Sequence, residues 1–405
     1  MPPQSETVQF VDNKNKTEST TKSTKDTDKP EIWWANAILF ISYHLIAVVG
    51  AYYYWPNNWR VWMLFYINWQ LGTLGITLGY HRLWSHKSYT ARMPLRIVLA
   101  IMGTMGFQGS IKWWVLRHRL HHRYTDTDSD PYSAHRGLFF SHVGWIFLKS
   151  HYPKMENVDQ SDLNADPVVR FQHKYFIPMA LTYVLLLQPL IGYLWFGDAV
   201  SGFIWGGIIG RVAVWHCTFF VNSLAHYLGD QHYTLEVTAR GNLILALLTN
   251  GEGWHNYHHS FPFDYRNGIR LTDWDPTKWI IYALHTFTNQ VPSIRRIPDK
   301  DIEKASKRVI SHKSGLPVVQ VDGEILPVVP KSEVKKIYKD TKCVVIEGYV
   351  VNVDKFAEEH PGGEGIFRAY YGGGDCTAGY LKLNRHSEYA RSLVEGYRVA
   401  KVAAE

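Results

Sequence analysis

Four stretches of mostly apolar residues dominate the pattern of this chain: residues 34–54, 61–80, 175–196 and 203–221. A helix needs about 20 apolar residues to cross the hydrocarbon core of a bilayer, and each stretch comes near that length. Tryptophan and tyrosine residues gather near the ends of these stretches, as they do at membrane surfaces. The pattern predicts four transmembrane helices, although buried helices of a large soluble core would give a similar signal.

Lysine and arginine residues are distributed unevenly around these stretches. The short connections Pro56-Asn-Asn58 and Gly197-Asp-Ala-Val-Ser201 carry none, whereas the N-terminal tail, residues 82–174 and the chain after residue 222 are rich in both. The positive-inside rule therefore predicts that both termini lie in the cytosol. The first thirty residues are polar and rich in Lys, Thr and Ser, which predicts a disordered cytosolic tail and no cleavable signal.

Composition adds three constraints. The net charge is +7 and the pI is about 9.0, but the basic residues collect beside the apolar stretches, which favours anionic lipid or an anionic substrate over nucleic acid. The three cysteines form no C-x-x-C pair, so neither a disulfide framework nor a thiolate metal site is indicated. Arg211 lies inside the fourth stretch, where it is either a functional charge or a snorkelling or protein-buried side chain.

Histidine boxes follow these apolar stretches. Imidazole is a strong ligand for iron, zinc or copper. On a helix, residues three and four apart share one face. The histidines of the second box (118, 121 and 122) and those of the third box (255, 258 and 259) can therefore each converge on a single point. The two histidines of the first box, His81 and His86, are five residues apart and can share a site only if the helix ends between them. A His-rich surface tract is the simpler alternative, but these eight histidines could fill the shells of two ions: His81, His86, His118, His121, His122, His255, His258 and His259.

The boxes H-R-L-W-S-H, H-R-L-H-H and H-N-Y-H-H closely resemble those of the membrane acyl-CoA desaturases of the stearoyl-CoA Δ9 type, over about residues 32–297. The resemblance extends to Asn222-Ser-Leu-Ala-His226, which implies that His226 is a ninth ligand and that Asn222 approaches one metal through water. These two residues are four apart and are expected to share a helix face. The implied fold is four transmembrane helices under a cytosolic helical cap that holds a His-rich dimetal site.

The resemblance implies two iron ions, because removing hydrogen from an unactivated methylene requires a strong oxidant made from O2. Metal-bound histidines usually donate their other ring N–H to an acceptor. We expect such acceptors among five nearby carboxylates: Asp126, Asp128, Asp130, Asp230 and Glu252.

Substrate contacts are also implied by the resemblance. Four residues align with family positions that contact the thioester and nucleotide end of an acyl-CoA: Asn36, Gln108, Trp145 and Lys149. Many animal members have an Arg-Asp pair before the second box, whereas this chain has Leu116-Arg117, so binding of coenzyme A should differ in detail. Phe65 and Trp69 lie where the family closes its acyl tunnel; they either favour shorter chains or face lipid.

A soluble α+β pattern begins near residue 328. Residues 344–353 predict two strands around a Glu-Gly turn. The motif His360-Pro-Gly-Gly and the later His386 resemble cytochrome b5 over about residues 328–401, which implies that both histidines are axial ligands of haem b. The predicted organisation is a tail (1–30), a membrane desaturase domain (31–310), a linker (311–327) and a cytochrome b5-like domain (328–405).

The sequence thus predicts an acyl-CoA Δ9 desaturase that inserts a cis double bond into a long-chain saturated acyl-CoA, using O2 and electrons from its own haem domain. A C-terminal haem domain together with His255 opening the third box is similar to fungal members of the family. No flavin or Rossmann fingerprint is present, so a cytochrome b5 reductase is the expected partner, and the endoplasmic reticulum membrane is the expected location. The alternatives are an acyl hydroxylase, another regiochemistry, or a non-catalytic lipid-binding protein with haem and metal.

Overall fold

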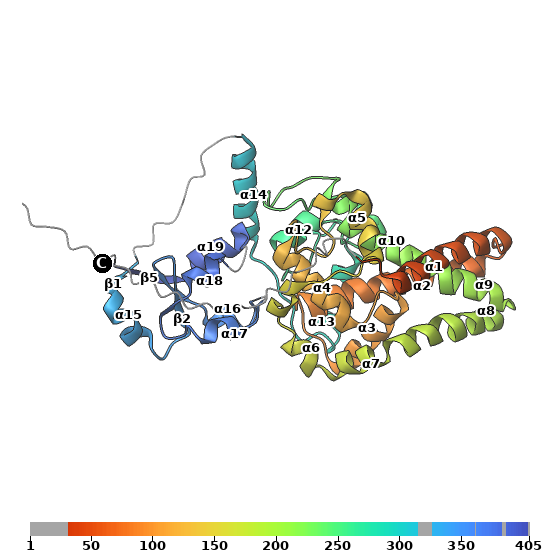
Figure 1. Ribbon diagram of the computed structural model, residues 1–405, viewed down its shortest axis with the longest axis horizontal. Coiled ribbons are helices and arrows are strands. Elements are labelled where there is room, and N and C mark those ends of the chain that lie inside the picture. The colour runs from red at the N-terminus through yellow and green to blue at the C-terminus, as the bar shows by residue number, and fades with distance from the viewer. Residues whose placement is uncertain (1–30, 315–325, 361, 383–385, 404–405) are drawn as a thin grey trace, which may run out of the picture.

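The computed structural model describes residues 31–314, 326–360, 362–382 and 386–403. Figure 1 shows three parts along the long axis: long helices at one end, shorter helices in the middle, and a small module with strands at the other end. The chain is mainly helical with a small α+β region, as predicted. The predicted tail and most of the predicted linker lie outside the described residues.

Among the described residues, three helices are long and apolar enough to cross a membrane. The first is α1 (Trp34–Tyr53). The second spans Pro167–Phe196 and consists of α7 (Pro167–Thr182), η5 (Tyr183–Leu187) and α8 (Gln188–Phe196). The third spans Ala199–His226 and consists of α9 (Ala199–Ser201), η6 (Gly202–Ile209), α10 (Gly210–Asn222) and η7 (Leu224–His226). These helices include three of the four predicted spans.

The remaining predicted span, residues 61–80, lies in α2 (Trp59–Leu74) and its continuation η1 (Gly75–Ser85). This helix is long, but it is not among the three candidates. Aromatic and polar residues such as Asn68 and Thr73, both buried, lower its hydropathy. The helix packs against α3 and α10. The four-span arrangement therefore stays a prediction.

Arg211 is buried inside the protein, with 1% of its surface exposed. Its guanidinium donates to the carbonyl oxygens of Met105 and Gly206, at 2.9 and 2.8 Å, and also to that of Gly207. Gly206 and Gly207 belong to the π-helical segment η6, in which the regular α-helical hydrogen-bond pattern is broken. Of the readings left open by the sequence, the structure supports a protein-buried arginine that satisfies backbone carbonyls.

Shorter helices form a cap beyond the long ones. Its buried core joins side chains of η1, α3, α4, α7 and α13, including Tyr80, Leu99 and Ile281. The elements of the cap are α3 (Met93–Met105), α4 (Ile111–Tyr124), η2 (Ala134–Arg136), α5 (Leu138–His142), η3 (Gly144–Phe147), η4 (Pro153–Asn157), α6 (Ser161–Ala165), α11 (Leu243–Leu248), α12 (His255–Ser260), α13 (Pro276–Phe287) and α14 (Asp299–Ser314).

The C-terminal module is a five-stranded sheet in the order β1-β5-β3-β2-β4. The predicted hairpin is confirmed: β2 (Cys343–Ile346) pairs antiparallel with β3 (Tyr349–Asn352). Glu347 and Gly348 both have positive φ, at 49° and 78°, as a tight two-residue hairpin turn requires. The other elements are β1 (Val328–Val329), α15 (Lys331–Tyr338), α16 (Asp354–Ala357), α17 (Gly365–Arg368), β4 (Gly374–Asp375), α18 (Thr377–Lys382), α19 (Glu388–Gly396) and β5 (Arg398–Val402). All three cysteines are buried and free, as expected.

Candidate metal centre and haem site

The nine predicted histidine ligands lie together in two groups. Within each group, the atoms that could bind an ion lie within 4.8 Å of one another. Eight of the nine side chains are buried, and His122 is half-buried. The first group contains His81, His86, His118, His122 and His258, and the second contains His121, His226, His255 and His259.

The Nε2 atoms of these histidines face one another. In the five-histidine group, Nε2 of His258 lies 3.0 Å from that of His81 and 2.9 Å from that of His122. In the four-histidine group, Nε2 of His255 lies 3.2 Å from that of His226 and 3.0 Å from that of His259. Imidazole nitrogens bound to one metal at about 2.0–2.1 Å come about this close together, so both groups fit a metal ion.

A π-helical turn brings the two histidines of the first box together. The backbone N–H of His86 donates to the carbonyl of His81 at 3.1 Å, which is the i→i+5 pattern of a π-helix. Residues five apart therefore lie one above the other, and the two rings are 4.8 Å apart between centroids. The helix η1 does end between them, at Ser85, as the spacing required. The sequence did not indicate the π-helical geometry that aligns them.

The second and third boxes do not each converge on one point, and this prediction was wrong. His118 and His122 of α4 belong to the five-histidine group, whereas His121 between them belongs to the four-histidine group. In α12, His258 is likewise separated from His255 and His259. Residues four apart stay nearly in line on a helix, but residues next to each other diverge by about 100°. The second and third boxes therefore each supply both groups, whereas the first box supplies the five-histidine group alone.

Asn222 does not share a helix face with His226. It is the last residue of α10, and the chain turns at Ser223 (φ −113°, ψ −82°) before His226 in the 3-10 turn η7. The expected i to i+4 relation was wrong because the helix ends between these residues.

Three of the five expected carboxylates lie behind the histidines. Glu252 Oε2 lies 2.8 Å from His81 Nδ1, and Asp130 Oδ1 lies 2.9 Å from His121 Nδ1. Asp126 acts through Thr238, whose hydroxyl lies 2.7 Å from Asp126 Oδ1 and 2.8 Å from His226 Nδ1. Such partners fix the orientation of a ligating imidazole and make it a better donor to the metal.

Asp128 and Asp230 were wrongly expected among these partners. The side chain of Asp128 is exposed, and that of Asp230 is 78% exposed and lies 3.9 Å from His232, which belongs to neither group. Both carboxylates point to solvent although they are close to ligands in sequence.

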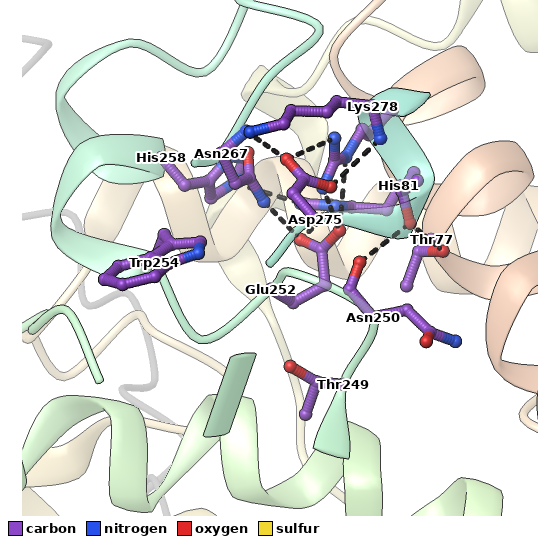
Figure 2. Close-up of polar contacts among 12 residues, drawn as sticks. Thr77, His81, Thr249, Asn250, Glu252, Trp254, His258, Asn267, Asp275 and Lys278 are labelled. Atoms are coloured by element: carbon purple, nitrogen blue, oxygen red, sulfur yellow. Dashed lines mark hydrogen bonds and ion pairs between the residues drawn. The ribbon is translucent and has the colours of Figure 1, made fainter. Parts of the chain in front are cut away.

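A buried charge network extends from Glu252, and the sequence analysis missed it (Figure 2). Arg82 Nη2 lies 2.9 Å both from Glu252 Oε1 and from Asp275 Oδ1. Asp275 is fully buried and also accepts backbone N–H groups, including that of Asn267 at 2.8 Å. The side-chain amide of Asn267 donates to Glu252 Oε2 at 2.7 Å. The position of Arg82 within the first box was the one available signal. This network holds Glu252 against His81.

Burial keeps most of these imidazoles neutral and available to bind metal. Burial, together with neighbouring charged groups that include other imidazoles, holds the pKa of six of them well below the usual range: His86, His118, His122, His255, His258 and His259. Burial opposes ionisation of Glu252, but His81 and Arg82 outweigh it and lower the pKa of this carboxyl to about 2. The five-histidine group is thus backed by an ionised carboxylate, which compensates part of the charge of bound metal.

The Glu252→Gln variant should lose metal from the five-histidine group. Glutamine keeps the shape of the side chain but removes the charge behind His81, and loss of such partners typically weakens metal binding by about 10–100-fold. Metal retention under chelator competition would measure the effect. The matched control is Asp128→Asn, because that carboxylate is exposed. Equal retention in the two variants would show that Glu252 does not support the site.

His360 and His386 face each other in the C-terminal module. Their ring centroids are 6.2 Å apart. Two imidazoles bound to one iron from opposite sides, with bonds of about 2 Å, would have centroids about this far apart. Tyr380 stacks on His386 at 4.3 Å, and its carbonyl lies 3.1 Å from His386 Nδ1, which orients that ring. Burial, together with His386 and Arg123, lowers the pKa of His360 to about 3. The residues present fit a haem.

The expected substrate contacts occupy two places. The start of α1, which carries Asn36, lies against the segment with Trp145 and Lys149, since the Lys149 N–H donates to the Glu31 carbonyl at 2.8 Å. Gln108 lies elsewhere: its amide donates to the Thr218 hydroxyl at 2.8 Å and accepts from the Trp114 indole at 3.3 Å. The Trp114 ring stacks on His118 at 4.8 Å. Gln108 therefore lies beside the metal centre.

Comparison with known families accounts for this arrangement. The family model for fatty acid desaturases matches residues 58–270, which is more than half of the chain. The chain belongs to the fatty acid desaturase family. This desaturase is an oxidoreductase, and its two histidine groups suit a pair of iron ions. A second family model, the cytochrome b5-like haem/steroid binding domain, matches residues 330–403, so the C-terminal module binds haem.

Two fungal relatives match nearly the whole of this desaturase, and an animal relative matches about three-fifths of it. A probable acyl-CoA desaturase of Schizosaccharomyces pombe is 39% identical over 91% of this chain and 77% of the relative. Acyl-CoA desaturase 1 of Saccharomyces cerevisiae is 36% identical over 91% of this chain and 73% of the relative. Stearoyl-CoA desaturase 5 of Bos taurus is 40% identical over 62% of this chain and 77% of the relative. The fungal resemblance indicated by the motifs is confirmed.

Proposed function

We propose that this chain is an acyl-CoA Δ9 desaturase that inserts a cis double bond into a long-chain saturated fatty acyl-CoA, using O2 and electrons from its own cytochrome b5-like domain. The observation that carries the proposal is the combination, in one chain, of two inward-facing histidine groups and a bis-histidine haem site. The names of the relatives support the acyl-CoA substrate.

The nine histidines are proposed as the iron ligands, with Asn222 contributing through water to one ion. Bound iron would supply the redox chemistry with O2 that breaks two unactivated C–H bonds. The protein's part is to hold neutral imidazoles in a dry, buried site and to keep their orientation through Glu252, Asp130 and Thr238. Because most of these groups are buried, bulk water is excluded from the reacting carbons.

Trp145, Lys149 and Asn36 are proposed to receive the polar end of the acyl-CoA. The indole N–H of Trp145 is buried and has no hydrogen-bond partner among the described residues, so it is available to the thioester carbonyl. Lys149 is exposed near the start of α1 and offers a cation to the nucleotide phosphates. Gln108, beside the metal centre, is proposed to contact the chain closer to the reacting carbons.

Phe65 and Trp69 are proposed to limit the length of the acyl chain. Their rings stack at 6.2 Å, and the Trp69 indole donates to Cys217 Sγ at 3.3 Å. Phe65 also contacts the ring of Trp205 in η6. These contacts with other helices support an inward position and count against the lipid-facing alternative.

We place the protein in the endoplasmic reticulum membrane, with four spans and with both termini and the metal centre cytosolic. Three apolar helices and the uneven distribution of lysine and arginine support this topology. A cytochrome b5 reductase would then supply electrons from a reduced pyridine nucleotide on the cytosolic side.

Single cysteines placed at Asn57 and at Ala199 should react with a membrane-impermeant thiol reagent from the lumenal side alone. The three native cysteines are buried, so the background should be low. A cysteine at Asp128, which is exposed in the cap, should react from the cytosolic side alone and serves as the control. Lumenal reaction at Asp128 would contradict the four-span topology.

Product analysis in desaturase-deficient cells tests the proposed function. Cells that express this chain should accumulate monounsaturated acyl chains with the double bond at Δ9, identified by mass spectrometry. Hydroxylated chains in place of unsaturated ones would assign the chain to acyl hydroxylation, and absence of any product from iron-loaded protein would contradict an enzymatic role.

A further inference from the structure

The cytochrome b5-like domain meets the desaturase domain through an aromatic contact. The ring of Tyr389 in α19 lies 4.7 Å from the ring of Phe261, between centroids, at an angle of 73°. Phe261 is fully buried and forms an apolar cluster with Tyr257 and Ile302, and Tyr389 packs against this cluster. Figure 1 shows α19 beside the base of α14, next to the cap. The two domains therefore share a small apolar core.

Each residue of this contact is close in sequence to a proposed cofactor ligand. Tyr389 comes three residues after the haem ligand His386, and Phe261 comes two residues after His259 of the four-histidine group. Electron tunnelling weakens exponentially with distance and proceeds better through bonded and packed atoms than across a gap. A route from His386 to Tyr389 follows covalent bonds, and so does a route from Phe261 to His259. The whole path therefore crosses one non-bonded contact, between the two aromatic rings.

Charged side chains surround the aromatic contact. Glu236 of the desaturase domain accepts the Glu388 backbone N–H at 2.8 Å and lies 3.8 Å from Arg391. Arg308 of α14 lies 4.0 Å from Glu395 of α19. Arg295 lies 3.5 Å from Glu359, the residue before His360. Exposed pairs of this kind add little affinity, but they fix orientation.

We propose that the surface around Phe261 is the docking site of the chain's own cytochrome b5-like domain, and that Tyr389 and Phe261 conduct electrons from the haem to the four-histidine group. The inference rests on the proposed function. In each transfer the haem iron is oxidised from the ferrous to the ferric state and the dimetal centre gains one electron. Two transfers per turnover, with two protons and the two hydrogens of the substrate, reduce O2 to two waters. The reductase, a flavoprotein that uses reduced pyridine nucleotide, re-reduces the haem each time.

Stopped-flow oxidation of the pre-reduced haem in the full-length, iron-loaded protein, mixed with stearoyl-CoA and O2, tests the contact. Tyr389→Leu removes the ring but keeps an apolar side chain, and it should slow haem oxidation by about two- to tenfold, which is the factor by which loss of an aromatic pair typically weakens a contact. Tyr389→Phe keeps the ring and should oxidise at the wild-type rate. Tyr370→Leu, at an exposed tyrosine of the same domain, is the matched control.

Charge exchange tests the docking orientation independently. Glu236→Arg and Arg391→Glu should each slow haem oxidation, and the double variant should recover part of the rate, because the ion pair is restored with its charges reversed while the hydrogen bond from the Glu388 N–H stays lost. Reduced haem spectra must match the wild type in every variant. Unchanged haem oxidation in Tyr389→Leu, or no recovery in the double variant, would overturn the docking site.

A second assay tests the proposed function independently of the docking site. Single-turnover product formed with excess soluble cytochrome b5 reports the desaturase domain without the internal contact. Product from Tyr389→Leu in that assay, together with slow internal haem oxidation, supports the route. Absence of product from the wild type with either donor would contradict the proposed function and not the contact.

Discussion

Alanine at any one of the nine histidines should abolish desaturation while leaving the protein in the membrane. Each imidazole places an Nε2 atom inside one of the two groups, so each substitution removes a ligand and leaves a gap in a buried shell. Loss of an outer partner already costs about 10–100-fold in metal affinity or activity, so loss of a ligand should cost more. His258→Ala and His259→Ala sample the two groups, and product analysis with metal content measures the effect.

His232→Ala is the matched control for these variants. Its side chain is 63% exposed and belongs to neither group, so activity and metal content should stay at the wild-type level. Metal content must be measured because zinc binds such sites more strongly than iron(II) in the Irving–Williams order. Protein overproduced without added iron is expected to contain zinc and to be inactive. Full activity in several ligand variants would rule out the assignment of these histidines.

Replacement of His360 or His386 by alanine should eliminate the reduced b-type absorption band and lower desaturation sharply. The centroids of these rings are 6.2 Å apart, and the two histidines are proposed to hold one haem. Loss of either would remove one of the two protein ligands of the haem iron. The histidine groups of the desaturase domain lie on other elements and should still take up iron. Absorption spectra, metal content and product formation would be compared in cells that lack any other cytochrome b5.

Soluble cytochrome b5 should restore part of the activity of these haem-less variants. A tethered donor has an effective concentration typically near the millimolar range, which a soluble donor does not reach in cells. Rescue should therefore rise with donor concentration and remain below the wild-type level. Unchanged turnover in the double variant without any added donor would show that the C-terminal domain does not supply the electrons.

Much of the fold and site follows from local patterns in the sequence. The runs of β-branched and apolar residues on both sides of Glu347-Gly348 specify the hairpin, because strand preference and turn conformation are both local properties. The histidine boxes name eight of the nine members of the two groups, and the motif Asn222-Ser-Leu-Ala-His226 names the ninth. The His360 motif and His386 likewise predict the pair that faces each other in the C-terminal domain.

The features that the sequence analysis got wrong or missed depend on tertiary structure. The division of α4 and α12 between two groups depends on how these helices cross, and spacing within one helix does not contain that information. Asp275 is distant in sequence from Arg82 and reaches it only through the fold. Asp230 is close to the ligand His226 in sequence, but its side chain points to solvent. The contact between Tyr389 and Phe261 joins two domains and leaves no pattern in either sequence segment.

The most direct measurement uses stearoyl-CoA deuterated at C9 and C10, incubated with the purified iron-loaded protein, O2 and a reductase. The proposed function predicts a monounsaturated product that has lost one deuterium from each of these two carbons and has gained no oxygen. A product that keeps both deuterium atoms on each of these carbons and has its double bond elsewhere would contradict Δ9 regiochemistry. A product that gains one oxygen and loses a single deuterium would contradict desaturation itself.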